Sequence, residues 1–583
     1  MSEVSQPEPG PIAADSGSAR PIRDVADGYV TRVAELDPRI ATYIGLPVGE
    51  DRLPDLSPAG RAAMDELARS TLAELDAADR EASPGPASTD AERLCGRLLR
   101  ERLGADLATS EADEYLREVM NVYGLQERVQ GIFLMMPTST AEEWGSVTRR
   151  MTRVPEALAG LRESLSDDAR RGLFTASPRQ VVAVAEQLGQ WVAAGDGRGW
   201  FADFTAAAEV PPSLRAELDT AAANAAEATA ELRDWLRGDY LDEVRRTADG
   251  VGVERYRVWA RFWNGANLDV EETYEWGWAQ YHELQAQMQA EAHEVLPGAT
   301  VRQAMDQLDE HGEAVEGEEE LRARLQQVID EVIRDLDGRY FDIPDPVKHF
   351  EVRIAPPGAA AAPYYNGPSE DFSRPGRTWI PTLGRTRFPL WSLLSTLYHE
   401  GVPGHHLQLG QWVYLAPQLS TFQTSVGGVD ACIEGWALYA ERLMDELGYL
   451  RTPGDRLGFL EGQMLRAIRV VIDIGMHLEL TIPAESPMAA GQKWTPELGR
   501  EFLAAHSGRP PEYLDSEIVR YLGLPGQAIS YKIGERAWLR GLAAARAAHN
   551  ARGENLDMKR WHMAALSLGC LGLDDLFDEL SQL

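Results

Sequence analysis

The sequence predicts a mainly α-helical protein in which a small β-sheet lies beside a helix that carries a histidine cluster. From residue 24 to about residue 345, long stretches show apolar residues at helical spacing, interrupted by Pro and Gly. Residues 338–390 then become rich in Pro and Gly and contain short extended runs. Residues 391–398 contain neither Gly nor Pro, and we expect them to run as one buried helix into the histidines. Helical lobes should therefore flank a groove near this cluster.

The expected helices follow from this periodicity and from residues typical of helix ends. Ser177 followed by Pro178 is typical of an N-cap with proline at the first helical position. The acidic run 310–320 is expected to form a solvated helix start, because negative charge is favourable at a helix N-terminus. The main helical stretches are 57–79, 90–107, 141–165, 178–194, 271–293 and 321–336.

By composition, the chain divides into a leader and two lobes. Residues 1–22 are rich in Pro, Ser and Gly, lack the features of a secretory signal, and are expected to be a disordered leader. We place a mainly helical N-terminal lobe at 23–345 and a catalytic, metal-binding lobe at 346–583. No run of 18 apolar residues is present, so the sequence predicts a cytoplasmic protein without a membrane-spanning helix.

The composition limits the classes of partner. The 583 residues are 44% hydrophobic, which is enough to bury a large interior. A formal net charge of −35 repels phosphate backbones and anionic lipid, so neither nucleic acid nor a membrane is an expected partner. This surface suits a cationic or neutral substrate. The sequence leaves the oligomeric state undecided, with a homodimer as one alternative. Three scattered cysteines do not form a disulfide framework.

The most informative motif is His399-Glu-Gly-Val-Pro-Gly-His-His406, which holds three of the eleven histidines. Neutral imidazole is the commonest side-chain ligand of zinc, and a neighbouring glutamate often serves as the base for a metal-activated water. Glu400 is therefore the candidate base. The alternative is a polar helix end whose histidines lie on the surface.

The spacing of this motif is irregular for a zinc-binding helix. In His-Glu-x-x-His the two histidines share one face, but here Pro403 stands at the fourth position after His399. On a straight helix neither His405 nor His406 could share a metal with His399. Pro403 removes a helical hydrogen bond and Gly404 loosens the next turn, so a bulge or kink is expected there. The spacing does not decide between His405 and His406.

A third ligand should come from another helix, and Glu434 is the best candidate. Two histidines and one carboxylate leave an open position for water. Asp430 and Glu441 lie on roughly the same face of the expected helix, so either could instead be a ligand or support one. Cys432 is expected to pack against the site, with a thiolate ligand as the alternative.

Further candidates follow in the C-terminal part. Arg469, Asp473 and His477 form a stripe in which Asp473 could orient a catalytic His477, or in which all three form a structural ion-pair ladder. Tyr531 is the candidate donor to the scissile carbonyl. The candidates for substrate binding are Arg520, Tyr521, Gln527, Lys532, His406 and Arg377, with Arg520 or Lys532 as the anchor for a substrate carboxylate.

Arg377 closes a turn-rich loop over 364–377, and an extended run over 378–382 follows it. Pro381 fits an edge strand better than an interior strand. We therefore expect an edge at which an extended peptide could add as a further strand.

The motifs His399-Glu-Gly-Val-Pro-Gly-His-His-Leu-Gln408 and Glu434-Gly-Trp-Ala-Leu-Tyr439 resemble those of the bacterial "domain of unknown function 885" family. Two later stretches, 469–477 and 525–534, fit the same family. The resemblance implies a zincin-like, mostly helical fold, related in layout to carboxypeptidase Taq and thimet oligopeptidase. It also implies that His405 is the second histidine ligand, because the position of His406 is held by Tyr in some members.

Together these observations predict zinc-dependent hydrolysis of peptide or amide bonds in small or unfolded peptides. His399, His405 and Glu434 would hold one Zn²⁺, although other divalent metals fit such a set. Glu400 would act as the base and Tyr531 would assist at the oxyanion. Two alternatives stay open: a tailoring enzyme that acts on a small amide or biosynthetic intermediate, and a catalytically silent binding protein.

Overall fold

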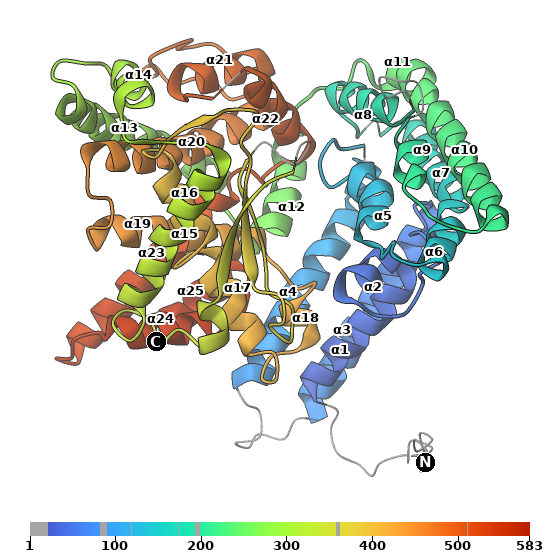
Figure 1. Cartoon of the computed structure of the whole chain (residues 1–583), viewed down its shortest axis with the longest axis horizontal. Helices are drawn as coiled ribbons and strands as arrows, with labels where there is room; N and C mark the ends of the chain where they lie inside the picture. Colours follow the sequence, from blue (N-terminus) through green and yellow to red (C-terminus); the bar gives the residue numbers. More distant parts are fainter. Residues whose placement is uncertain are drawn as a thin grey trace.

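The computed structural model shows a mainly helical protein with two small sheets, which confirms the predicted fold class at this level (Figure 1). It describes residues 21–81, 90–117, 119–173, 175–192, 199–356, 362–509 and 511–583. Residues 1–20 of the predicted disordered leader lie outside the described residues, and the first helix begins at Ile22. Within the described ranges, no helix combines the length and apolar character needed to cross a bilayer.

Helices make up most of the first half of the chain. Their bounds are α1 Ile22–Leu36, α2 Pro38–Ile44, α3 Pro58–Glu81, α4 Asp90–Glu111, η1 Glu114–Arg117, η2 Gln126–Gly131, α5 Ile132–Met135, α6 Ala141–Met151, α7 Val154–Arg171, α8 Pro178–Val192, α9 Gly199–Ala206, α10 Pro212–Trp235, η3 Leu236–Tyr240, α11 Leu241–Val244, α12 Gly252–Asn264, α13 Val270–Val295, α14 Val301–His311 and α15 Glu318–Leu336.

The second half adds the strands and the helices of the histidine region. Their bounds are β1 Ala314–Glu316, η4 Asp345–Lys348, β2 Phe350–Ile354, β3 Tyr364–Asn366, β4 Gly376–Ile380, β5 Arg387–Pro389, α16 Leu393–Glu400, α17 His405–Tyr414, α18 Thr421–Thr424, α19 Asp430–Glu446, α20 Pro453–Leu478, α21 Pro496–His506, α22 Pro511–Gly523, α23 Ser530–Ala551, α24 Met558–Leu566 and α25 Leu573–Leu580.

Two helical predictions need correction. The stretch 141–165 is two helices, since α6 ends at Met151 and α7 begins at Val154. Pro155 explains the break, because a proline removes the hydrogen bond to the carbonyl four residues earlier. The acidic run 310–320 is not a continuous helix start either. It contains β1, and only after Gly317, with φ of 95°, does α15 begin.

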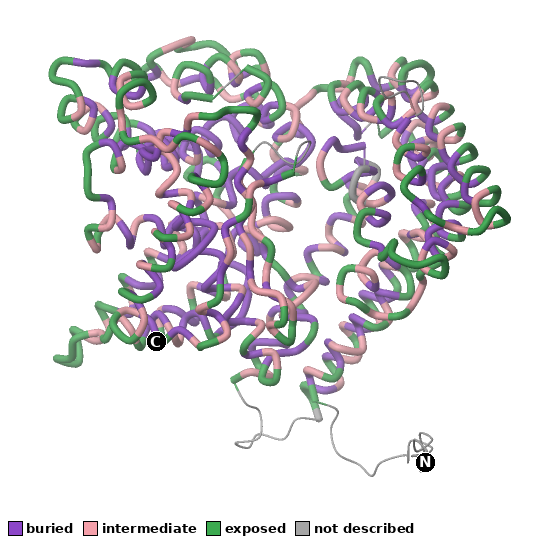
Figure 2. Tube along the Cα trace, in the orientation of Figure 1, coloured by how far each residue is buried: buried purple, intermediate pink, exposed green. Residues whose placement is uncertain are grey.

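The hydrophobic interior has two large parts and a small third cluster of Met120, Trp259 and Leu524. A smaller core lies within the helices from α5 to α11, on the right of Figure 1. A larger core joins α1, α3 and α4 to the helices from α12 onward, and buried residues are dense there (Figure 2). The larger core contains residues from both sides of the predicted boundary at 345/346, and the division into lobes at that point stays a prediction.

The strands of both sheets contact helices α14, α15 and α17. β1 pairs antiparallel with β5, while β4 is the middle strand of a three-stranded sheet between β2 and β3. The predicted edge at 378–382 is therefore wrong, since β4 is hydrogen-bonded on both sides. Pro381 is compatible with this arrangement because β4 ends at Ile380, one residue before the proline.

Helices α19 and α23 cross in direct backbone contact. At Gly534 an added Cβ would lie 2.0 Å from the carbonyl oxygen of Ala431, and at Gly435 it would lie 2.3 Å from the backbone of Gly534. Both positions therefore need glycine, because any side chain would push the helices apart. This crossing places the start of α23 close to the α19 residues that follow Asp430.

We expect Gly534→Ala to lower the free energy of unfolding by about 1–3 kcal/mol, because the new methyl group meets backbone atoms that cannot move aside. Denaturant titration followed by circular dichroism measures the change. Gly104→Ala is the matched control, since this mid-helix position in α4 has open space around it. An equal loss in both variants would contradict the close helix crossing.

Candidate metal centre

A tight reversal separates the two histidine-bearing helices. α16 ends at Glu400 and α17 begins at His405, so the predicted interruption of the helix is present. The backbone N–H of Gly404 donates to the carbonyl of Tyr398 at 3.0 Å, and the N–H of His406 donates to the carbonyl of Gly401 at 3.1 Å. An added Cβ at Gly404 would lie 1.9 Å from the His399 carbonyl oxygen. Only glycine therefore allows the chain to turn this closely and return His405 toward His399.

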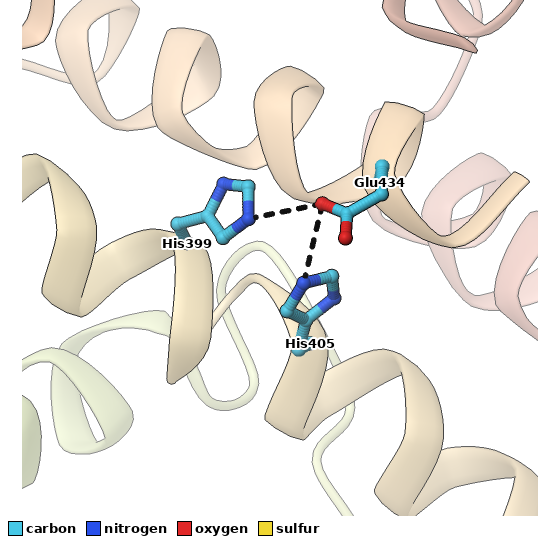
Figure 3. A group of neighbouring side chains, drawn as sticks. All are labelled: His399, His405 and Glu434. Carbon is cyan, nitrogen blue, oxygen red and sulfur yellow. Dashed lines mark ion pairs between the residues drawn. The ribbon is translucent and has the colours of Figure 1, made fainter. Parts of the chain in front are cut away.

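His399, His405 and Glu434 converge on one point (Figure 3). Glu434 Oε2 lies 3.3 Å from Nε2 of His399 and 3.6 Å from Nε2 of His405. The two imidazole side chains are 5% and 9% exposed, while the Glu434 side chain is 21% exposed. The group is thus reached from the side of Glu434.

The geometry of this group fits a zinc ion. Zinc bonds of about 2.0–2.2 Å in a tetrahedron place neighbouring ligand atoms about 3.4 Å apart. The two nitrogen–oxygen separations lie near that value, and one possible ligand atom from each residue falls within 4.8 Å of the others. Glu434 Oε2 is buried without a hydrogen-bond partner among the described residues. Two imidazole nitrogens and one carboxylate oxygen are a usual zinc ligand set.

Glu441 orients His399. The Nδ1–H of His399 donates to Oε1 of Glu441 at 2.8 Å, and the hydroxyl of Ser395 donates to Oε2 of the same carboxylate. This pairing turns the Nε2 of His399 toward Glu434. A carboxylate behind a metal-ligating histidine fixes the ring and its tautomer. Of the two neighbours that could have replaced Glu434, Glu441 thus lies in a supporting position.

Asp430 and Cys432 lie apart from the three-residue group. The side chain of Gln527 donates to Asp430 at 3.1 Å, and burial raises the pKa of Asp430 to about 6. Cys432 is fully buried within the larger core. This burial agrees with its expected packing role.

His406 faces away from this group. Its Nε2–H donates to the carbonyl of Val347 at 2.7 Å, and its Nδ1 accepts from the hydroxyl of Tyr365 at 2.9 Å. Burial lowers the pKa of His406 to about 4, so the ring is neutral. Because both nitrogens are engaged, His406 anchors α17 to the segment before β2 and to β3.

The charges in the group favour a cation. Burial disfavours a charged His399, but the carboxylates of Glu434 and Glu441 outweigh burial and raise the pKa of His399 to about 10. Burial also opposes ionisation of Glu434, yet its contacts with His399 and His405 hold its pKa well below the usual range. For Glu400, burial is the largest effect and raises the pKa of the carboxyl group. A protonated His399 therefore supplies the positive charge that a metal ion would replace.

Tyr531 lies between this group and several arginines. It is half-buried, and its pKa is raised by burial and then by the nearby carboxylate of Glu434. The guanidinium of Arg469 stands over its ring at 4.7 Å. Tyr531 thus lies near Glu434, and its role as a hydrogen-bond donor to substrate stays a prediction.

Arg520 and Gln527 are tied to neighbouring side chains. Arg520 donates to the carboxylate of Glu517 at 3.0 and 3.1 Å and to the side-chain amide oxygen of Gln527 at 2.7 Å. Gln527 in turn holds Asp430. The two predicted substrate-binding residues thus connect α22 to the start of α19.

The other predicted site residues make contacts within the protein. Lys532 is fully buried and donates to Gln463 and Glu535. Tyr521 is buried, its hydroxyl donates to Glu517, and it accepts from Arg469 at 2.9 Å. The interior positions of Lys532 and Tyr521 are those of packing residues, and their roles in binding stay predictions.

His477 is also buried, and it does not form the expected pair with Asp473. Its Nε2–H donates to the backbone carbonyl of Tyr521 at 3.0 Å, and burial lowers its pKa to about 3. The closest separation from Asp473 is 3.8 Å, which is too long for a hydrogen bond. Asp473 instead accepts from Tyr256 and from the backbone N–H of Gly526.

Arg377 belongs to the sheet. It lies on β4, and its Nε donates to Glu351 on the neighbouring strand β2 at 2.8 Å. Its predicted contact with substrate stays a prediction.

Sequence reasoning missed Arg466, Ser395 and Tyr365. Arg466 lies three residues before Arg469 on α20, a spacing that places both on one helical face. That spacing could have signalled a second arginine beside Tyr531. Ser395 and Tyr365 had no such signal, because their contacts depend on the fold.

A family model matches almost the whole chain. It covers residues 38–580 and carries the description "Bacterial protein of unknown function (DUF885)". The chain belongs to this family. Membership confirms the family resemblance of the histidine and glutamate motifs. No curated protein matches the sequence of this DUF885 protein.

Two solved structures resemble this DUF885 protein over its length. One is described as a "putative lipoprotein from Colwellia psychrerythraea", with 20% identity and a TM-score of 0.79, over 96% of this chain and 98% of that chain. The other is a "putative lipoprotein of unknown function from Shewanella oneidensis", with 19% identity and a TM-score of 0.73, over 96% and 100%. At these identities the likeness shows a common fold.

We expect the purified protein to hold about one equivalent of zinc, and His399→Ala, His405→Ala and Glu434→Ala to lose it, because each removes one of three ligands. His406→Gln should keep the metal, since both ring nitrogens of His406 contact other residues. Elemental mass spectrometry on protein purified without chelators measures the content. Loss of metal from His406→Gln with retention in His405→Ala would reverse the ligand assignment.

Zinc binding at pH 7 should release about one proton, because a ligating imidazole must be neutral and His399 is protonated in the metal-free protein. The affinity should consequently fall as the pH is lowered. Calorimetric titration in buffers of different ionisation enthalpy measures the release. A binding enthalpy independent of the buffer would contradict the protonated state of His399.

Proposed function

We propose that this protein is a metal-dependent hydrolase that cleaves peptide or amide bonds of small or unfolded peptides, with zinc as the expected ion. The observation that carries the proposal is the convergence of His399, His405 and Glu434 beside the buried carboxyl group of Glu400. A bound zinc ion would supply a Lewis acid that polarises a carbonyl and acidifies water. A helical metallopeptidase fold and a cytoplasmic location belong to the same proposal.

Glu400 is the proposed base. It directly follows His399 at the end of α16 and is 8% exposed, and its pKa is raised by burial. A raised pKa suits a carboxylate that accepts a proton from water and then gives it to the leaving amine. A site that only binds has no use for this group, so Glu400 supports catalysis over a silent binding protein.

Tyr531 is the proposed donor to the oxyanion. Its hydroxyl forms no hydrogen bond with the described residues, and its side chain is half-buried beside Glu434. Because its pKa is raised, the phenol stays protonated and can donate a hydrogen bond when the carbonyl oxygen gains charge.

The burial of the ligand group supports a small or extended substrate. The side chains of His399 and His405 are 5% and 9% exposed, and that of Glu434 is 21% exposed. A small molecule or an extended peptide segment could approach such a position, whereas the surface of a folded protein could not. The expected absence of nucleic-acid and membrane partners, and the open question of a homodimer, stay as predictions.

Glu400→Gln should lower kcat by about 10²–10⁴-fold, because general acid–base catalysis contributes that much. The zinc content should not change, since Glu400 is not a ligand. Cleavage of an unbiased peptide mixture and of small acyl amino acids, followed by mass spectrometry, measures the loss and separates a peptidase from a small-amide enzyme.

Glu446→Gln is the matched control, because Glu446 is an exposed glutamate at the end of α19. Full activity in a metal-loaded Glu400→Gln variant would remove Glu400 as the base. No cleavage of either substrate class by the zinc-loaded wild type would remove the proposed function.

A further inference from the structure

Three arginines that follow the histidines in the sequence lie close to Tyr531. We call Arg466, Arg469 and Arg520 the arginine cluster. The guanidinium groups of Arg466 and Arg469 lie 5.9 and 4.7 Å from the centre of the Tyr531 ring. Arg520 and Glu434 are also close enough to act on the charge of Tyr531. Tyr531 therefore lies near both the arginine cluster and a candidate metal ligand.

The arginine cluster has three guanidinium groups, of which only two form direct ion pairs with a carboxylate in the part of the chain that the structure describes. Arg469 and Arg520 share one carboxylate, that of Glu517, at 2.7 and 3.0 Å. Among the described residues, Arg466 has no carboxylate within ion-pair distance. A protein with a net charge of −35 has many acidic residues that could fill this place. Arg466 is therefore a half-buried guanidinium that no described carboxylate holds by a direct ion pair, and such a group can bind an anion.

Arg466 is the member of the cluster with donors to spare. One of its terminal nitrogens donates to the carbonyl of Gly462 in its own helix at 3.0 Å, and its Nε is buried without a partner. Arg469 instead donates to Tyr521 and Glu517, and the donors of Arg520 go to Glu517 and Gln527. These two arginines are held in place, while Arg466 can receive a ligand.

Arg466 also lies on the metal side of the cluster. Its guanidinium acts on the charges of Glu400 and Glu441 as well as on Tyr531. Arg466 and Tyr531 are both half-buried, so solvent reaches them although most of their surface is covered. A charge pair in such a place is stronger than one at an open surface.

We propose that Arg466 binds a carboxylate of the substrate, and that the substrates are short peptides or acyl amino acids with a free carboxylate close to the scissile bond. The planar guanidinium matches a carboxylate through two parallel hydrogen bonds. The inference rests on the proposed function, whose substrate class it narrows. It also refines the expectation from net charge, because a local group of guanidinium side chains can bind an anion within an acidic protein.

The test separates binding from turnover. Zinc-loaded Glu400→Gln is mixed with a pool of N-acetyl tripeptides, made once as free acids and once as C-terminal amides. Affinity selection followed by mass spectrometry then measures which peptides are retained. We expect the acids to bind about 10- to 100-fold more tightly than the amides, which is the usual effect of a charge-assisted hydrogen bond. Equal retention of both pools, or retention of neither, would overturn the inference.

A second substitution assigns the preference to one residue. In the Glu400→Gln background, Arg466→Met keeps an unbranched apolar stem without the charge and should bring the affinity for acids down to that for amides. Arg466→Lys should restore part of the difference in affinity between acids and amides, because lysine carries the positive charge but lacks the planar guanidinium. Arg456→Ala is the control on the same helix, where an exposed arginine pairs with Glu291 and Asp445. Circular dichroism and zinc content verify that each variant is folded and loaded.

The acid-to-amide ratio distinguishes recognition from a structural role. A purely structural Arg466 would weaken both pools alike and leave the ratio unchanged, which would refute the proposal. Wild-type protein assayed on the same pools reports on the proposed function independently. If Glu400→Gln prefers acids but the wild type cleaves neither pool, the carboxylate site stands and the hydrolase proposal fails. If the wild type cleaves both pools equally, the hydrolase proposal stands and the carboxylate site fails.

Discussion

The absence of a side chain at Gly404 is the constraint on which the candidate site depends. Within four residues the chain leaves α16, passes through Pro403 and starts α17, with the backbone of Gly404 held against the carbonyl of Tyr398. A longer loop would bring back a second histidine only by ordering more residues, at a higher cost in conformational entropy. A straight helix would carry that histidine away from the first. The reversal makes an irregular histidine spacing compatible with the shared ion.

Electrostatics explains why so many acidic groups can lie together in the interior. Glu400, Glu434 and Glu441 are close to one another, and carboxylates so placed repel each other and resist burial. His399 pairs with two of them and bears a positive charge when no metal is present. Arg466 of the arginine cluster adds a second positive charge that acts on Glu400 and Glu441. Cationic groups therefore offset the repulsion among these carboxylates.

The sequence predicted the helical class and the convergence of His399, His405 and Glu434, because both depend on local patterns. Helical periodicity marks α3, α4 and α13, and the histidine motif and Glu434 are only 35 residues apart at most. The choice of His405 needed the family resemblance, since spacing alone left His406 equal. Pro155 could have predicted the break between α6 and α7. The prediction of one helix over 141–165 instead followed the apolar periodicity, which continues across the break.

Features that depend on chain segments distant in sequence could not be predicted. β4 is the middle strand of its sheet, and no residue in its sequence indicates that it pairs with a strand on each side. Asp473 and His477 have the spacing of a helical pair, yet Asp473 Oδ2 accepts from Tyr256 of α12, and His477 Nε2–H donates to Tyr521 of α22. Arg466 looks like any surface arginine until the fold leaves it without a carboxylate. In each case the deciding contact comes from a part of the chain that sequence periodicity cannot locate.

The two large hydrophobic cores have a consequence for how such a protein can change over time. All three candidate ligands belong to elements of the larger core, and the helices from α6 to α10 pack around an interior of their own. Substitutions inside that smaller core alter its shape without repacking the residues beneath the histidines. Natural variation can therefore change the helices around the smaller core while the three candidate ligands stay in place. Related chains with the same three residues can then differ in the shape of the part that does not carry them.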